Sequence, residues 1–120
     1  MPKKLSFIGI GRTTDPERKA TTGTEIIGTG VELLRGVGGV VKVFNSRFRN
    51  YAAPGWPDCV WIFRDTVFLI EVKGKGDKFR ENQTRFAESI SDHCGLHVRY
   101  RVVNSVDGFH SIAREGADIT

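Results

Sequence analysis

The stretch GWPDCVWIFRDTVFLIEVKGKG, residues 55–76, contains two apolar runs that acids interrupt. Asp58 opens the first run, and Glu71 lies inside the second. Two short runs rich in Val, Ile, Phe and Trp, separated by Arg64-Asp65-Thr66, predict two neighbouring β-strands. The central strands of the predicted fold therefore carry charged side chains, and the faces on which these lie decide what they can do.

The length of the loop between the strands decides whether the two acids lie on one face of the sheet. Side chains alternate between faces along a strand, so a shift of one residue moves a side chain to the other face. If the loop has two residues (65–66) or four residues (64–67), Asp58 lies opposite Lys73 and Val60 lies opposite Glu71. A loop of odd length would place the two acids on different faces. Even lengths are common in hairpins, so we expect the acids and the lysine to converge at the open end of the hairpin.

Two carboxylates on one face need a compensating charge. Asp58 and Glu71 repel each other at short distance, and one of them takes up a proton unless a cation is present. Mg²⁺ binds one or two carboxylates together with water and phosphate oxygens, so a divalent ion would relieve the repulsion. A salt bridge from Lys73 to either acid is the alternative, and the residues alone leave both interpretations open.

The segment after these strands has the pattern of an amphipathic helix, predicted from Phe79 to about Cys94. Its inner face is formed by Phe79, Gln83, Phe86 and Ile90. Gln83 is the polar member of that face, and an unpaired buried amide costs about 1–3 kcal/mol. A carboxylate–metal–water cluster would supply a partner for it, and so would a backbone carbonyl.

The remaining elements predict a single α/β domain. A first helix begins after the predicted N-cap Thr24 and ends at Gly38-Gly39. Strands are predicted at 40–44, 58–63, 67–73 and 97–103, and a short final helix begins at 105–107. The order α-β-β-β-α-β-(α) is typical of an α/β sandwich around a mixed sheet. A chain of 120 residues has room for one domain, which we place at 24–120, after a flexible or loosely docked N-terminal arm at 1–23.

The charge of the chain is compatible with a nucleic-acid partner. The net charge is +4, the pI is about 9.3, and basic residues gather around the acidic positions. Solvated surface charge is the alternative for each basic group. No apolar stretch approaches the ~20 residues of a membrane span, and the N-terminal region does not resemble a signal peptide. We therefore expect a cytoplasmic location, in the host cytoplasm if the source is viral. Cys59 and Cys94 lack metal-binding spacing, so we expect reduced thiols.

Pro57-Asp58, Glu71-Val72-Lys73 and Gln83, in this order, resemble the PD-(D/E)xK nuclease motif. The blocks GWPDCVWIF, FLIEVKGKGDKFRENQTRF and VVNSVDGF are more closely similar to those of the virus-type replication–repair nuclease domain, VRR-NUC, in its stand-alone, phage-like form. The resemblance covers about residues 24–110. It implies a restriction-endonuclease-like αβββαβ core, with a mixed central sheet flanked by helices.

The resemblance also implies a role for each residue of the motif. Asp58, Glu71 and the backbone carbonyl of Val72 would bind Mg²⁺ or Mn²⁺. Lys73 would orient or deprotonate the attacking water, and Gln83 would position the substrate or the water. The reaction would be hydrolysis of a phosphodiester bond.

An upstream acid on the first helix completes the set of catalytic residues that the resemblance implies. Glu25 fits this position, and Glu32, on the same face of the helix, is the alternative. An exposed helical face is the other interpretation for both, and Glu25 is also favourably placed near the helix N-terminus. The expected DNA-binding residues are the basic ones on either side of the motif: Arg47, Arg49, Lys75, Lys78, Arg80 and Arg85.

The function implied by the resemblance is that of a metal-dependent, structure-selective DNA endonuclease. Single-domain viral members of the family resemble dimeric enzymes that cleave branched DNA. We therefore expect a homodimer that resolves Holliday junctions in DNA repair or recombination. Two alternatives stay open. One is a non-catalytic nucleic-acid-binding module, which the aromatic residues Phe48, Tyr51 and Trp56 favour. The other is a restriction-type endonuclease, for whose recognition elements 120 residues leave little room.

Overall fold

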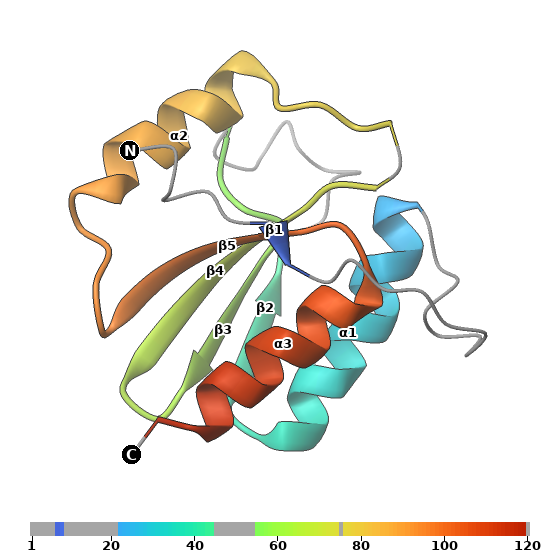
Figure 1. Cartoon of the computed structure of the whole chain (residues 1–120), viewed down its shortest axis with the longest axis vertical. Helices are drawn as coiled ribbons and strands as arrows, with labels where there is room; N and C mark the ends of the chain where they lie inside the picture. The colour runs from blue at the N-terminus through green and yellow to red at the C-terminus, as the bar shows by residue number, and fades with distance from the viewer. Residues whose placement is uncertain (1–6, 9–21, 45–54, 75, 120) are drawn as a thin grey trace.

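The computed structural model describes residues 7–8, 22–44, 55–74 and 76–119, which form a mixed β-sheet with helices on both faces (Figure 1). In chain order the elements are β1 (Phe7–Ile8), α1 (Gly23–Val37), β2 (Val40–Val43), β3 (Cys59–Phe63), β4 (Thr66–Val72), α2 (Glu81–Ser91), β5 (Val98–Val103) and α3 (Val106–Ala117). The strand order is β1-β5-β4-β3-β2; β2, β3 and β4 pair antiparallel, and β5 pairs parallel with both β4 and β1. The predicted α/β fold with its αβββαβ core is confirmed.

The loop between β3 and β4 has an even length, as predicted, but it lies one residue earlier in the chain. Phe63 pairs with Thr66, so the loop is Arg64-Asp65 and not 65–66. Arg64 has a φ of 58°, in the left-handed region that tight hairpin turns use. Thr66 is β-branched and buried, and it joins the strand.

The observed register corrects the predicted cross-strand partners of the acids. Val60 pairs with Leu69 and not with Glu71. Asp58 lies one residue before the first paired position of β3, and it contacts Ile70 and Val72 of β4, where the sequence predicted Lys73 as its partner. Because the register differs by two residues, the side chains stay on the predicted faces. The convergence of the two acids survives the correction, since Asp58 and Glu71 are within hydrogen-bonding reach of each other.

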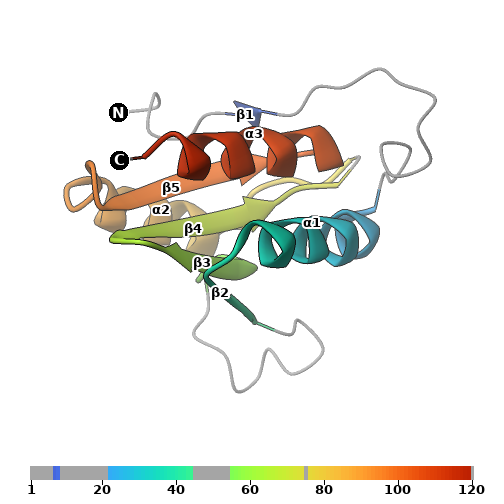
Figure 2. The ribbon, with the colours of Figure 1, turned by 90° about the horizontal axis from the view of Figure 1, so that it is seen from below.

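The sheet separates two apolar cores, with α1 and α3 on one face and α2 on the other (Figures 1 and 2). Alternate residues of β3 and β4 enter the core beneath α1 and α3: Cys59, Trp61, Phe68, Ile70 and Val72. On the opposite face, Leu69, Tyr100 and Val102 of the sheet form a second core with Ala87 of α2. Each large apolar side chain that is fully buried contributes roughly 1.5–3 kcal/mol. Glu71 lies between Ile70 and Val72 in the chain, so it points toward the α2 face.

The first helix begins earlier than predicted and packs closely against α3. Its N-cap is Thr22 rather than Thr24, and Thr22 forms a capping box with Glu25. Thr22 Oγ1 accepts from the Glu25 N–H at 3.2 Å, and Glu25 Oε1 accepts from the Thr22 N–H at 3.3 Å. A Cβ at Gly30 would lie 2.3 Å from the Phe109 ring, so the approach of the two helices requires glycine there.

The two later helices differ in length from their predictions. α2 spans Glu81–Ser91 rather than 79–94. The Lys78 carbonyl accepts from Lys73 Nζ and the Arg80 N–H donates to Gln83 Oε1, so neither group forms a backbone bond of a longer helix. α3 begins after Ser105, as predicted, but has 12 residues and is not a short helix.

Two residues of the predicted N-terminal arm belong to the sheet. Phe7 and Ile8 pair with Val102 and Val103 along the free edge of β5. The other arm positions, at 1–6 and 9–21, lie outside the described residues, as does most of the predicted basic and aromatic loop, at 45–54.

The two cysteines of the chain are free thiols that differ in burial. Cys59 is buried, Cys94 is half-buried, and both are free cysteines. Burial raises the pKa of Cys59 to about 12, so its thiol is unreactive near neutral pH. Among the described helices, none combines the length and the apolar character that crossing a membrane requires.

Candidate active site

Four of the predicted site residues meet at the end of the sheet where β4 leads toward α2. Asp58 directly precedes β3, Glu71 is the last residue but one of β4, and Lys73 directly follows that strand. Gln83 lies in the first turn of α2. Alternation along the strands turns the charged side chains toward the face that α2 covers, and the helix brings the amide to them.

Asp58 is held in place by the backbone of the two neighbouring strands. Its Oδ2 accepts from the Val72 N–H at 2.7 Å. Its own N–H donates to the Ile70 carbonyl at 3.0 Å, and its carbonyl accepts from the Phe44 N–H at 2.9 Å. These contacts fix the carboxylate against β4. Asp58 thus contacts the N–H of Val72 and not its carbonyl. The role of the Val72 carbonyl as a metal ligand stays a prediction.

Glu71 is a carboxylic acid with only 1% of its surface exposed. Its Oε2 accepts from Gln83 Nε2 at 2.9 Å. Its Oε1 is buried and accepts no hydrogen bond from a described N–H or O–H group. A buried acceptor without a donor costs about 1–3 kcal/mol, and more when it is charged. When Glu71 is ionised, this oxygen is therefore left for a cation or a water, and when Glu71 is protonated, its carboxyl group donates to Asp58.

Burial disfavours the ionised form of both carboxyl groups, and the charge of Asp58 further disfavours that of Glu71. Burial raises the pKa of Glu71 to about 8, and the charge of Asp58 adds to the rise. Burial also raises the pKa of Asp58, although the Val72 N–H and a hydrogen bond with Glu71 oppose the rise. Without a cation, Glu71 is thus the group that keeps its proton near neutral pH and shares it with Asp58. This is the conflict that the sequence predicted.

Lys73 is buried, with 7% of its surface exposed, and its ammonium group is surrounded by acceptors. Nζ donates to Gln83 Oε1 at 2.6 Å and to the Lys78 carbonyl at 3.0 Å. It also lies 3.6 Å from Glu71 Oε2 and 4.8 Å from the centre of the Phe79 ring. The ion pair that the sequence left as an alternative is therefore present, but the hydrogen bonds of Lys73 go to neutral groups.

Gln83 links the lysine to the acid. Its Oε1 accepts from Lys73 and, at 2.9 Å, from the Arg80 N–H, and its Nε2 donates to Glu71. Donors on one side and a carboxylate on the other fix the orientation of the amide. The bond to Arg80 also supplies half of a capping box for α2. The predicted need of a buried glutamine for a partner is met by both charged residues.

The residues at this site fit a divalent cation of the Mg²⁺ type. Such ions take one or two carboxylates and complete their shell with water and phosphate oxygens. Asp58 and Glu71 supply the two carboxylates, and Glu71 Oε1 supplies an oxygen that lacks a described donor. Within the described ranges, no group of three or more His, Cys, Asp or Glu side chains is arranged to hold a metal. The donor set therefore favours a hard cation with an open coordination sphere over zinc.

Glu25, the predicted upstream acid, lies in the first turn of α1 and is exposed. It forms the capping box with Thr22 described above. A Cβ at Gly23 would lie 3.7 Å from Asp77 Oδ2, so this turn approaches the segment that follows Lys73. The start of α1 therefore lies near the segment that follows Lys73. A catalytic role for Glu25 stays a prediction.

Two further predicted residues form exposed ion pairs on the helices. Glu32, the alternative upstream acid, pairs with Arg35 at 3.2 Å. Arg85 pairs with Glu81. Exposed pairs of this kind contribute about 0.2–1 kcal/mol and exchange partners readily. These weak ion pairs neither support nor exclude the roles predicted for Glu32 and Arg85.

Three of the predicted DNA-binding residues are described, and three are not. Lys78 and Arg80 are exposed on the segment between Lys73 and α2, and the Arg80 charge acts on Asp58. Arg85 lies on α2. The others, Arg47, Arg49 and Lys75, lie outside the described residues.

Two partners of Lys73 were not predicted from the sequence. The Lys78 carbonyl and the Phe79 ring both contact its ammonium group. A backbone carbonyl has no signature in the sequence, and Phe79 was predicted to lie in the helix. The signal that existed is the run of polar residues at 74–78, which favours a turn that returns the chain over Lys73.

The comparisons with known proteins found a match to the fold but none to the sequence. No family model matches the sequence, and no curated protein matches it. A solved structure described as "VRR_NUC domain" aligns with a TM-score of 0.62 and 22% identity, covering 79% of this chain and 97% of that one. At this identity the likeness shows the fold alone, and the activity must be argued from the site. The chain thus has the nuclease-type fold of a VRR_NUC domain, the family to which its motifs pointed.

Proposed function

We propose that this chain is a metal-dependent endonuclease that hydrolyses phosphodiester bonds of DNA. The observation that carries the proposal is the adjoining pair of the half-buried Asp58 and the buried Glu71, in which Glu71 Oε1 has no described donor. Such a pair costs stability, because burial disfavours the ionised form of both groups and the charge of Asp58 disfavours that of Glu71. Such costs concentrate at functional sites, and two carboxylates are what a hard cation requires.

The acids provide the ligands of the site. Asp58, Glu71 and the Val72 carbonyl would hold Mg²⁺ or Mn²⁺, which supplies Lewis acidity toward the phosphodiester when bound. Glu71 must release its proton to bind, because the carboxylate is the ligand form. The Val72 N–H keeps Asp58 Oδ2 in place while Glu71 changes its protonation state.

Lys73 and Gln83 position the water and the phosphate. An ammonium group has three N–H donors, and Gln83 Oε1 and the Lys78 carbonyl take two of them. The third is left for the Glu71 carboxylate, an attacking water or a phosphate oxygen. Gln83 holds Lys73 and Glu71 in a fixed relation through its two ends, which keeps a water bound by Lys73 next to the metal ligands.

The preferred substrate in this proposal is branched DNA, and the acting form is a homodimer that resolves Holliday junctions. Cutting two strands at a branch needs two active sites, and two-fold dimers are the commonest oligomers. Val40 and Ile62 pair across β2 and β3 and are 63% and 44% exposed, which offers apolar surface for a subunit contact. The implied process is DNA repair or recombination, in a viral setting.

The test compares a four-way junction with a linear duplex of the same sequence, with Mg²⁺, with Mn²⁺ or with chelator. We expect cleavage of the junction with either metal and none with chelator. Lys73→Ala should lower the rate by about 100-fold or more. Arg114→Ala removes an exposed cation on α3 and serves as the matched control, with unchanged cleavage. Light scattering of the same samples measures the mass of the acting form.

The alternative of a non-catalytic nucleic-acid-binding module makes the opposite forecast. It requires binding that is indifferent to divalent metal and to Asp58→Asn. If the wild-type protein and Lys73→Ala act alike on every DNA substrate, the catalytic proposal is wrong. Cleavage that ignores branch structure would instead support the restriction-type alternative.

A further inference from the structure

An exposed tryptophan lies two residues before Asp58 and belongs to a row of four aromatic rings. Trp56 is 46% exposed, whereas Tyr100, at one end of the row, is buried. The Trp56 ring lies 4.9 Å from that of Phe86, centre to centre, and Phe86 lies 6.1 Å from Tyr100. Phe44 contacts Trp56 edge-on at 6.3 Å. The indole is therefore supported from below by a packed row while its outer surface stays open to solvent.

The backbone on both sides of Trp56 is held in place. Gly55 has a φ of 87°, and a Cβ there would lie 2.2 Å from the Asn82 carbonyl in the first turn of α2. Pro57 is buried, and Asp58 is bonded to the strands on both sides. A side chain on this segment pays little further ordering entropy when it binds a ligand, because its backbone and its ring contacts are already fixed.

We propose that Trp56 is a stacking surface for an unpaired nucleobase next to the phosphate that the site cleaves. This inference rests on the proposed function and narrows its substrate class to DNA with an unstacked base beside the cut. An indole offers the largest π-face of any side chain, and stacking of a base on an aromatic side chain tolerates every base.

The position of Trp56 favours an unpaired base over a duplex. Inside a duplex, the faces of each base are covered by its neighbours, so only a splayed, terminal or single-stranded base can meet the ring. Arg80, exposed on the segment before α2, acts on Asp58 electrostatically and supplies a cation for a phosphate. Trp56 would thus bind the base of one nucleotide, and Arg80 would bind the phosphate beside it.

The fluorescence of the protein gives a direct readout that needs no cleavage. The chain contains two tryptophans, and Trp61 is fully buried, so a change on binding reports Trp56. In chelator, a short single-stranded oligonucleotide should quench the emission, and a hairpin in which the same sequence is paired with its complement through a base-free linker should quench it far less. Trp56→Phe should abolish the quenching signal.

Binding to variants separates stacking from packing. Trp56→Leu keeps an apolar contact with Phe86 but removes the large π-face, and it should weaken single-strand binding about 5- to 100-fold. Trp56→Tyr keeps a ring and should retain most of the affinity. Leu96→Ala, at a side chain that is 74% exposed, is the control for loss of exposed apolar surface and should bind like the wild type. Thermal unfolding of each variant verifies that it folds.

The outcomes bear separately on this inference and on the proposed function. Wild-type affinity in a folded Trp56→Leu variant would overturn the stacking inference, whether or not the protein cleaves branched DNA. Equal quenching by single strand and hairpin would overturn the choice of an unpaired base. If quenching and the variant series agree with expectation but no DNA is cleaved with Mg²⁺ or Mn²⁺, the stacking inference stands and the nuclease proposal fails.

Discussion

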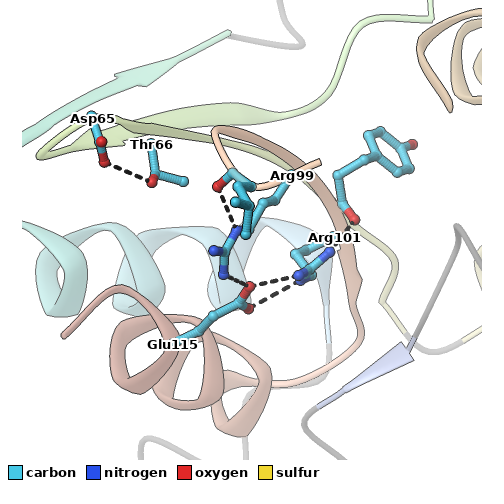
Figure 3. Close-up of polar contacts among 7 residues, drawn as sticks. Asp65, Thr66, Arg99, Arg101 and Glu115 are labelled. Atoms are coloured by element: carbon cyan, nitrogen blue, oxygen red, sulfur yellow. Dashed lines mark hydrogen bonds and ion pairs between the residues drawn. The ribbon is translucent and has the colours of Figure 1, made fainter. Parts of the chain in front are cut away.

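The chain has two clusters of partly buried charge on opposite faces of the sheet, and they are built on opposite principles. Figure 3 shows Arg99 and Arg101 directed from β5 toward Glu115 on α3. Glu115 accepts from Arg99 Nη1 at 2.5 Å and from Arg101 Nε and Nη2 at 3.0 and 2.5 Å. In the candidate site, by contrast, Asp58 lies beside Glu71, so like charges adjoin.

The same type of side chain therefore titrates in opposite directions in the two clusters. Burial acts to raise the pKa of Glu115, but the hydrogen bonds from Arg101 and Arg99 outweigh it and hold that pKa below its usual value. The pKa of Glu71 is raised to about 8, because burial and Asp58 act together and Lys73 opposes them only in part. A cluster that serves stability pairs its charges, whereas a cluster that awaits a cation leaves its acids in conflict.

The strongest test of this difference is the isosteric change of one glutamate in each cluster. Glu71→Gln should lower DNA cleavage by about 100-fold or more, because it removes a ligand from the proposed metal site. The metal-free variant should fold at least as stably as the wild type, since a buried acid is replaced by a neutral amide. Cleavage assays and urea unfolding in chelator measure the two effects. Added Mg²⁺ should raise the thermal midpoint of the wild type and not that of the variant.

Glu115→Gln should show the reverse pattern. Its loss leaves Arg99 and Arg101 with a weaker acceptor, and we expect a cost of about 1–3 kcal/mol in the free energy of unfolding. Cleavage by the folded variant should stay within about twofold of the wild type, because the cluster lies on the other face of the sheet. Urea unfolding and the junction assay check both parts. A Glu115→Gln variant that unfolds normally but cleaves poorly would contradict the division of roles.

The two clusters should also respond to pH with opposite sign. Between the ordinary carboxyl pKa of 4.5 and about 8, folded metal-free protein keeps a proton on Glu71 that the unfolded chain has lost. Stability therefore falls as pH rises, by at most about 1.4 kcal/mol per unit, and levels off above the folded pKa. The contribution of Glu115 is complete above 4.5 and is lost as pH falls through its lowered pKa.

Urea unfolding in chelator over a range of pH tests these signs. Relative to the wild type, Glu71→Gln should remove part of the decline between pH 4.5 and about 8, and Glu115→Gln should remove part of the decline below pH 4.5. A decline that neither variant alters would show that other groups set the pH dependence.

Alternation along the strands, together with an even loop length, predicted which charged side chains converge. The apolar runs of β3 and β4 fixed the faces, and the spacing of α2 identified Gln83 as the amide that meets Glu71. The ordered motif then pointed to the fold that the structural comparison shows. The convergence was predicted because burial of an apolar face constrains every second residue of a strand and because the loop has the even length that was expected.

The details that the sequence missed depend on contacts between distant residues. Arg64 takes a left-handed conformation that is typical of Gly, Asn or Asp, so the sequence did not indicate where the turn lies. The predicted register therefore differs by two residues from the observed one. β1 has two residues, too few for any periodic pattern. The raised pKa of Glu71 and its unpaired oxygen follow from burial under α2, which no local pattern reveals.

The smallest expected effect concerns the ring beneath the lysine of the site. The Phe79 ring lies 4.8 Å from Lys73 Nζ, and such a cation–π contact contributes about 0.5–1 kcal/mol, or about 2 when desolvated. Phe79→Leu keeps the apolar volume but removes the π-face, so we expect Lys73 to be held less firmly. Cleavage at saturating DNA should fall by about two- to tenfold, with unchanged DNA binding in chelator.

A matched change at the other end of the strands tests whether this effect belongs to the site. The Phe63 ring lies under the Arg64 guanidinium, 5.0 Å from the carbon at its centre, so Phe63→Leu also removes a cation–π contact. It also loses the stacking of Phe63 on Trp61, so it should lower stability while leaving the cleavage rate of folded protein unchanged. Equal losses of cleavage in both variants would mean that Phe79 acts through stability alone. A loss confined to Phe79→Leu would show that a neutral ring helps to position the lysine in the cluster where the two acids adjoin.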